Sequence, residues 1–317
     1  MKIAFVGKGG SGKTTVSSLF TQYLSGSQAV LGIDADINMH MAELFAVEYK
    51  DATTISEKEP SEKIRTFLRG TNKLIASNNH FKKSTPPGTG SNLIKIDNPD
   101  DWFMARFARH VSSTLDVVIV GTYSEEGIAS SCYHNNLAIL ENVLSHTTDS
   151  GSVVVDMVAG TDAFASTLFA QFDALFFVAE PTTRSLAVYK QYERLARKGG
   201  VLNRLFVVGN KVEDDDDTSF IKMVVGERLI ASLSRSKHIL DVDKGRANLD
   251  TSLLSKADIA VLNSVKDITQ ENTMAAQDRL PLLWELHKTY VGQGYITDKF
   301  GDLTKQIDVS FRYPSSL

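Results

Sequence analysis

Glycine and lysine residues near the start of the chain have the types and the spacing of a phosphate-binding site. Residues 7–14 read GKGGSGKT, which satisfies the pattern G-x-x-x-x-G-K-[ST]. An apolar run precedes this segment and a helical pattern over 16–24 follows it, which is the context of a working phosphate loop. Glycines let backbone N–H groups turn inward around phosphate oxygens, and the helix N-terminus adds positive potential. The segment therefore predicts a site for the phosphates of a nucleotide.

The polar side chains of this loop have separate expected roles. Lys13 should reach the β- and γ-phosphates, Thr14 should offer its hydroxyl to Mg²⁺, and Thr15 could reach the α-phosphate. The residues expected to shape the loop or to bind phosphate through the backbone are Gly7, Gly9, Gly10, Ser11 and Gly12.

Aspartates follow two of the apolar runs. Asp34 and Asp36 come after residues 29–33, and Asp156 comes after 153–155. In open α/β sheets ligands sit at this carboxyl edge of the strands. Carboxylates beside a polyphosphate repel it unless a metal lies between them, so Mg²⁺ is implied. The alternative interpretation is that these acids only end strands or cap helices.

A second lysine in the loop, Lys8, is not required by the ordinary pattern and could simply be a solvated side chain. With Lys8, however, the sequence resembles the deviant Walker A ATPases, the group that contains MinD, ParA and the nitrogenase iron protein. In that group the lysine at this place crosses a dimer interface to the partner's nucleotide. The resemblance implies an ATP-dependent homodimer in which Lys8 acts like an arginine finger supplied in trans.

The same resemblance implies roles for residues at the strand ends. Asp36 would orient or deprotonate the attacking water, and Asp34 would lie nearer the hydration shell of Mg²⁺. Asp156 resembles the Walker B acid that holds a magnesium-bound water, and Gly160 resembles the switch glycine whose N–H senses the γ-phosphate.

Asn210 and Lys211 follow another apolar run, 205–208. The resemblance places an asparagine here against the adenine edge, and an amide suits that edge because it both donates and accepts. Asparagine also favours turns, so a purely structural role stays open. The N-K-x-D pattern that selects guanine is absent, because Glu213 follows Val212.

Short apolar runs that alternate with helical patterns would position these residues. Continuous β-branched runs suit strands buried on both faces. They predict an α/β fold with a doubly wound, mainly parallel sheet flanked by helices, as in P-loop NTPases. The runs are residues 3–6, 29–33, 117–120, 153–155, 174–178 and 205–208.

Domain organisation is predicted from where this alternation weakens. The ATPase domain is expected to span 1–235, with an insertion at about 45–110 that contains a long Pro-, Gly- and Ser-rich loop at 82–92. Residues 236–317 are expected to form a helical extension packed on the same domain. Its last part, 302–317, alternates more like a strand.

Several segments resemble one branch of this group, the CooC-type nickel-accessory ATPases that mature carbon monoxide dehydrogenase. They include TPPGTGS (85–91) and VVVDMVAG (153–160), and the resemblance covers about 1–215. That branch carries a C-x-C pair that contributes metal ligands at the dimer interface. Here the matching stretch reads Ser130-Ser131-Cys132, so the inherited metal site is incomplete.

Cys132 is the one cysteine of the chain, which excludes an intramolecular disulfide. One interpretation is a small buried thiol. Another is that Cys132 and His134 from two chains form an S2N2 set for a transition metal, zinc or nickel. A redox role is a third.

Composition limits the partners. A net charge of −4 gives no general attraction to nucleic acid or anionic lipid, although local basic segments at 194–204 and 235–238 are present. No apolar run approaches the roughly 20 residues that span a bilayer, and the first residues do not resemble a signal peptide. A cytoplasmic location, without membrane or nucleic-acid partners, is expected.

The predicted function is an ATP-dependent dimerising switch that hydrolyses ATP to ADP and phosphate, slowly or when stimulated by a partner. It would act as an accessory or maturation factor on a client protein or metalloenzyme. The alternative is a MinD- or ParA-like positioning or partition ATPase. Electron transfer is disfavoured, because a dimer-bridging [4Fe–4S] cluster needs two cysteines per chain.

Overall fold

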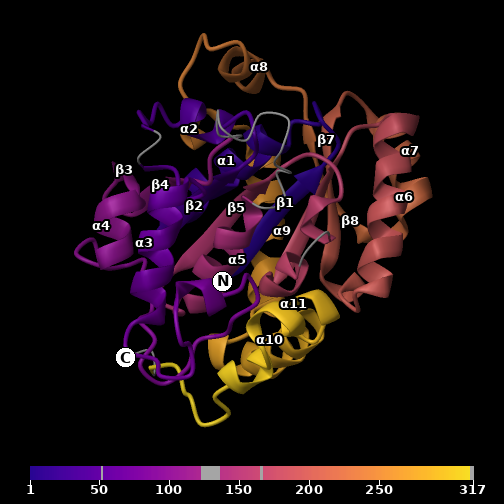
Figure 1. The fold of residues 1–317 in the computed structure, drawn as a ribbon. Helices are drawn as coiled ribbons and strands as arrows, with labels where there is room; N and C mark the ends of the chain where they lie inside the picture. The colour runs from indigo at the N-terminus through magenta and orange to yellow at the C-terminus, as the bar shows by residue number, and fades with distance from the viewer. Residues whose placement is uncertain (51–52, 123–135, 165–166, 315–317) are drawn as a thin grey trace.

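A central sheet organises the chain in the computed structural model, which describes residues 1–50, 53–122, 136–164 and 167–314. Its strand order is β3-β4-β2-β5-β1-β6-β7-β8 (Figure 1). Every pairing is parallel except β3 with β4. The predicted α/β fold with a mainly parallel sheet is confirmed. The strands are β1 Lys2–Gly7, β2 Val30–Ala35, β3 Arg109–Ser112, β4 Leu115–Ile119, β5 Ser152–Met157, β6 Ala174–Ala179, β7 Leu205–Val212 and β8 Leu229–Ser234.

Two of these strands, β3 and β8, were not predicted from the apolar runs. They form the two edges of the sheet. β3 alternates half-buried and exposed residues, and β8 is mostly half-buried. An edge strand has one neighbour and needs no continuous apolar run, so its sequence carries a weaker signal.

Helices cover both faces of the sheet, because the side chains along β1 pack alternately into two different cores. Ile3 and Phe5 pack in one core with α1 and α9, whereas Ala4 and Val6 pack in the other with α5 and α6. Successive side chains of a strand point to opposite faces, so a strand covered on both faces is apolar throughout. The helices are α1 Lys13–Ser25, α2 His40–Leu44, α3 Lys58–Arg69, α4 Trp102–Phe107, α5 Leu137–His146, α6 Thr183–Lys198, α7 Asp215–Val225, α8 Lys237–Asp243, α9 Lys256–Asn272, α10 Ala276–Val291 and α11 Gly294–Phe300.

The region predicted as an insertion packs into the main core. Ile64 and Leu68 of α3 are buried there, and α3 contacts α5. Phe67 stacks on Trp102 of α4 with ring centroids 4.5 Å apart. Between 81 and 101, all of which is described, the chain forms turns and coil without a helix. These residues therefore form a long loop between α3 and α4.

The C-terminal region contains the helices α8 to α11, but its end is not a strand. Within the described residues 302–314, Leu303–Gln306 is a 3-10 helix and the rest is turns and coil. Asp302 and Asp308 bond to nearby backbone N–H groups, which favours turns over extended backbone. The expected strand character is therefore wrong.

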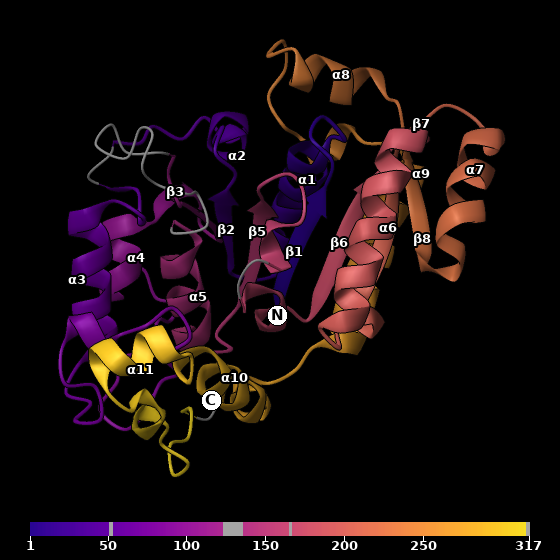
Figure 2. The ribbon, with the colours of Figure 1, turned by 45° about the vertical axis from the view of Figure 1, so that its right-hand side comes forward.

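The final segment crosses back onto the proline- and glycine-rich loop. Thr85 donates a hydrogen bond to Gln306 at 3.1 Å, and Asp308 accepts from the Thr89 N–H at 2.8 Å. Figure 2 shows α10 and α11 at one end of the sheet, with α8 at the opposite end where β1 terminates. α10 and α11 therefore lie away from the carboxyl edge of the strands, and α8 is the part of the extension that lies at that edge.

Candidate nucleotide site

The phosphate loop connects β1 directly to α1. Gly10 has φ +80° and Gly12 has φ +82°, in the left-handed region that favours glycine. A Cβ added at Gly12 would lie 2.2 Å from Asn210 Nδ2, whereas one at Gly10 would meet nothing within 4 Å. Gly12 is therefore required both by its backbone conformation and by the close approach of β7.

These two glycines give a matched pair of variants. Gly12→Ala is expected to destabilise the nucleotide-free protein by about 3 kcal/mol or more, because it combines backbone strain with a clash that displaces Asn210. Gly10→Ala carries only the strain, about 1–2 kcal/mol. Denaturant unfolding measures both free energies. Equal losses would contradict the close packing of Gly12 against Asn210.

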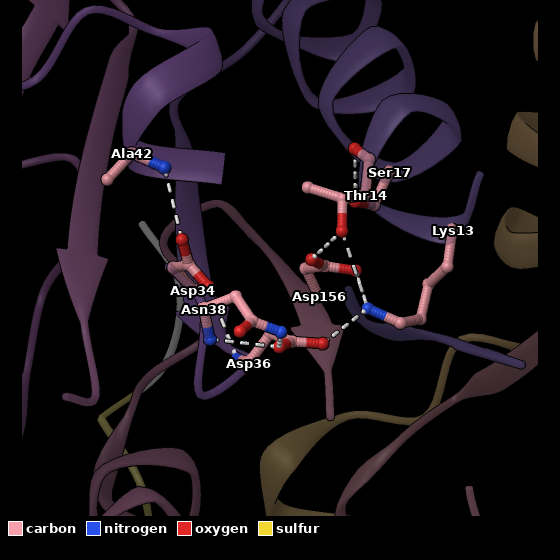
Figure 3. Close-up of polar contacts among 8 residues, drawn as sticks. All are labelled: Lys13, Thr14, Ser17, Asp34, Asp36, Asn38, Ala42 and Asp156. Carbon is pink, nitrogen blue, oxygen red and sulfur yellow. Dashed lines mark hydrogen bonds and ion pairs between the residues drawn. The ribbon is translucent and has the colours of Figure 1, made fainter. Parts of the chain in front are cut away.

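Three segments that are distant in sequence bring lysine, threonine and two aspartates together (Figure 3). Lys13 Nζ lies 3.1 Å from Asp36 Oδ2 and 2.9 Å from Asp156 Oδ1. Thr14 Oγ1 donates to Asp156 Oδ2 at 2.7 Å. Because β1, β2 and β5 are adjacent and parallel, their carboxyl ends meet at one edge. The structure thus assembles residues that the sequence singled out one by one.

The charges in this cluster shift one another's pKa values. Burial by itself lowers the pKa of Lys13, but the pairs with Asp156 and Asp36 outweigh it and the pKa is raised. At Asp36 burial is likewise outweighed by Lys13, and its pKa is lowered. At the fully buried Asp156 burial prevails over Lys13, and the pKa is raised. Lys13 favours the ionised form of both carboxylates, against the effect of burial.

A cavity of about 650 Å³ opens over this cluster, within the range of small-ligand sites. Its walls include the loop glycines 9, 10 and 12 together with Lys13, Thr14 and Asp36. Hydroxyl and carboxylate oxygens are the ligands that Mg²⁺ prefers, usually with phosphate and water completing the octahedron. Among the described residues no cluster of three or more His, Cys, Asp or Glu could hold a metal ion alone. The residues present fit Mg²⁺ bound jointly with a nucleotide's phosphates.

Asp34 is fully buried and organises the turn that carries Asp36. Its carboxylate accepts hydrogen bonds from the N–H groups of Asp36 at 3.2 Å and Ala42 at 3.1 Å (Figure 3). Burial, with a smaller contribution from Asp156, raises its pKa to about 7. These contacts give Asp34 a structural task, while its place in the magnesium hydration shell stays a prediction.

This raised pKa predicts how stability depends on pH. The folded chain keeps a proton on Asp34 that the unfolded chain releases, so this contribution is full below pH 3.8 and is lost as pH rises to about 7. A shift of this size corresponds to about 4 kcal/mol. Asp34→Asn is expected to flatten the slope of unfolding free energy over this range. Denaturant unfolding in EDTA measures it, with Asp298→Asn as an exposed control; parallel slopes for Asp34→Asn and wild type would contradict the assignment.

Asn210 and Lys211 both contact the backbone of the phosphate loop. Asn210 Nδ2 donates to Ser11 O at 2.8 Å, and Lys211 Nζ donates to Gly10 O at 2.5 Å. An adjoining cavity of about 160 Å³ is lined by both residues, by Ser234 at the end of β8 and by residues of α8. This volume leaves room beside Asn210 for part of a base. A contact between Asn210 and adenine stays a prediction.

Other predicted residues are placed as follows. The Gly160 N–H donates to Gly7 O at 3.0 Å, which brings the predicted switch glycine against the loop. Lys8 lies on the cavity wall, and its Nζ donates to Gly9 O at 3.0 Å. Cys132 and His134 lie outside the described residues.

Two acidic residues of the site were missed by the sequence analysis. Glu180 follows β6 and bonds Lys211, and Asp243 of α8 accepts from Thr15 Oγ1 at 2.7 Å. Glu180 ends a buried strand, as Asp156 does, and that position could have indicated it. Asp243 belongs to a segment without a motif and is brought to Thr15 only by the tertiary fold.

The fold and this edge cluster together define a P-loop nucleotide-binding protein. The chain belongs to the CobQ/CobB/MinD/ParA nucleotide binding domain family, whose model matches residues 3–247. The predicted membership of the MinD and ParA family is thereby confirmed, while the deviant Walker A role of Lys8 stays a prediction.

Curated relatives agree with this assignment. The chain is 29% identical over 232 residues to an uncharacterized ATP-binding protein of Methanocaldococcus jannaschii, covering 72% of this chain and 81% of that protein. It is also 29% identical over 224 residues to the carbon monoxide dehydrogenase accessory protein CooC of Rhodospirillum rubrum, covering 70% of this chain and 78% of CooC.

Solved structures share the fold. A plasmid partition protein of Borrelia burgdorferi B31 bound to AMPPNP superposes with a TM-score of 0.55 at 14% identity, covering 86% of this chain and 99% of that one. The MinC:MinD cell division protein complex of Aquifex aeolicus gives 0.55 at 13% identity, covering 86% and 96%. At such identities the likeness concerns the fold alone. Across the described residues, no helix has the length and apolar character needed to cross a membrane.

Proposed function

We propose that the protein is an ATP-dependent dimerising switch that hydrolyses ATP to ADP and phosphate and acts as an accessory factor on a client protein or metalloenzyme. The observation that carries the proposal is the cluster of Lys13, Asp36 and Asp156 beneath the phosphate loop. The similarity of the chain to the carbon monoxide dehydrogenase accessory protein CooC supports the accessory role.

Binding of ATP would redistribute the charges of this cluster. A triphosphate competes with Asp36 and Asp156 for the Lys13 ammonium, because Lys13 is the cation of a P-loop. The carboxylates then need a new cation, and bound Mg²⁺ supplies it while polarising the phosphoryl oxygens. Thr14 and Asp156, which hydrogen-bond each other, would hold that ion or its water, and Asp36, on the cavity wall, would lose its contact with Lys13.

Lys8 completes the proposal. Its side chain is 33% exposed at the cavity wall, and its contacts in the described structure are with the Gly9 carbonyl and, at 4.0 Å, with Glu180. An ammonium on such a wall can reach a second chain. We place it against the phosphates of the partner's nucleotide, where it would stabilise charge that develops in the transition state.

A separate part of the proposal is that Cys132 and His134 of two chains bind a transition metal as cargo. It predicts that ATP-bound dimers retain zinc or nickel through an S2N2 set. Metal analysis of wild type and Cys132→Ser after gel filtration tests it. Equal metal content in the two samples would remove the cargo and leave the ATPase switch in place.

Hydrolysis measured against protein concentration tests the switch itself. If the active form is a dimer, the rate per chain rises with concentration and reaches a plateau, whereas a monomeric enzyme gives a constant rate per chain. A constant rate at concentrations where the protein is monomeric would contradict the proposal.

A further inference from the structure

Glu180 lies between Lys8 of the phosphate loop and Lys211 of β7. Its Oε1 is 2.8 Å from Lys211 Nζ, and its Oε2 is 4.0 Å from Lys8 Nζ. The residue follows β6, and its N–H donates to Ser185 Oγ at 3.1 Å in the first turn of α6. Its backbone is therefore fixed by the strand and by the helix that follows it.

The two lysines bind neighbouring carbonyls of the loop. Lys8 Nζ donates to Gly9 O at 3.0 Å, and Lys211 Nζ donates to Gly10 O at 2.5 Å. Lys211 has φ +60°, a conformation that is uncommon for lysine and that the surrounding contacts must maintain. We call Lys8, Glu180 and Lys211 the Glu180 clamp. It joins the ends of β1, β6 and β7.

The two ion pairs of the Glu180 clamp differ in strength. The pair between Lys211 and Glu180 has the shorter distance, and the Glu180 side chain is only 16% exposed. The ion pair between Lys8 and Glu180 is at the distance limit for such pairs, and the Lys8 side chain is one-third exposed. Exposed pairs of this kind contribute little to the free energy of folding. A triphosphate brings several negative charges, so it can draw Lys8 away while Lys211 stays on Glu180.

We propose that Glu180 is a positioning residue that holds Lys8 on its own chain until the nucleotide of a second chain draws it across the interface. This rests on the proposed function, in which Lys8 acts in trans. Glu180 then sets how readily the ATP-bound dimer forms, because the contact with Lys8 must be given up at each association. Lys211 keeps the Glu180 carboxylate in place during the exchange.

Zero-length cross-linking with a carbodiimide observes this exchange directly, because it joins an amine and a carboxylate that are in contact. The nucleotide-free protein should give both the Lys8–Glu180 and the Lys211–Glu180 peptides in mass spectrometry. With Mg²⁺ and AMPPNP the Lys8–Glu180 peptide should fall severalfold while the Lys211–Glu180 peptide persists. An unchanged Lys8–Glu180 peptide in a sample that light scattering shows to be dimeric would overturn the inference and leave the proposed function standing. A sample that stays monomeric with AMPPNP would overturn both.

A matched pair of variants supplies a second readout. Glu180→Gln keeps an oxygen that accepts from Lys211 but removes the charge that attracts Lys8. At saturating AMPPNP its dimer dissociation constant should be about two- to fivefold lower than in wild type. Glu193→Gln, which breaks an α6 surface pair with Arg197, is the control and should leave the constant unchanged. Equal constants for Glu180→Gln and wild type would overturn the inference.

Discussion

Lys8→Ala is expected to reduce ATP turnover by about 10³-fold or more, which is the effect of removing a cation that acts like an arginine finger. It should also abolish dimer formation with ATP, because the partner's nucleotide loses its contact across the interface. Binding of ATP to the single chain should remain, since Lys13 and the loop backbone are intact. Steady-state hydrolysis and nucleotide binding measure these two quantities separately.

Mixing two inactive chains tests whether Lys8 acts in trans. A dimer of one Lys8→Ala chain and one Asp36→Ala chain contains one site with an intact Asp36 and an intact Lys8 from its partner. The heterodimer, isolated through a tag on the Lys8→Ala chain, should recover about half of the wild-type activity per dimer, because one of its two sites is complete. An isolated heterodimer as inactive as its components would show that Lys8 serves the nucleotide of its own chain.

Asp36→Ala is expected to retain ATP and to lose turnover by about 10² to 10⁴-fold, the usual contribution of a group that positions or deprotonates the nucleophile. Asp36 Oδ1 accepts from the N–H and the side-chain amide of Asn38, so the carboxylate is oriented before ATP binds. Its pKa is lowered chiefly through Lys13. We expect this pKa to rise when Lys13 turns to the phosphates of bound ATP, which would make Asp36 a better base.

Glu43→Gln is the control for this variant, because Glu43 also lines the cavity but has no place in the cluster of Lys13 and the aspartates. It should keep turnover close to that of wild type. Single-turnover hydrolysis separates the chemical step from ADP release. Normal turnover in Asp36→Ala would remove Asp36 from the mechanism and leave the role in water activation to another group.

The core of the fold and the phosphate site could be predicted because their signals are local. A strand covered on both faces is buried at every position and contains a nearly continuous apolar run, such as residues 3–6 in β1 and 153–155 in β5. The loop pattern fixes Lys13 and Thr14 by spacing alone. Asp36 and Asp156 could then be placed beside them, because the carboxyl ends of parallel strands meet at one edge.

The buried charged residues and the role of Glu180 could not be predicted, because they depend on tertiary contacts that no local sequence pattern encodes. Lys2 is fully buried at the start of β1 and donates to the carbonyls of Leu144 and Thr147. Arg279 of α10 is buried as well and pairs with Asp173, which ties the extension to the start of β6. In the sequence these are ordinary charged residues. Glu180 likewise gains its meaning only when β1 and β7 place Lys8 and Lys211 on either side of it.

Light scattering of the purified protein with no nucleotide, with ADP and with Mg²⁺ and AMPPNP tests the central claim most directly. The wild-type protein should have the 34.8 kDa mass of one chain in the first two samples and twice that mass in the third. Lys8→Ala should stay at the mass of one chain under all three conditions. The same mass in all three samples of the wild-type protein would contradict an ATP-dependent dimerising switch.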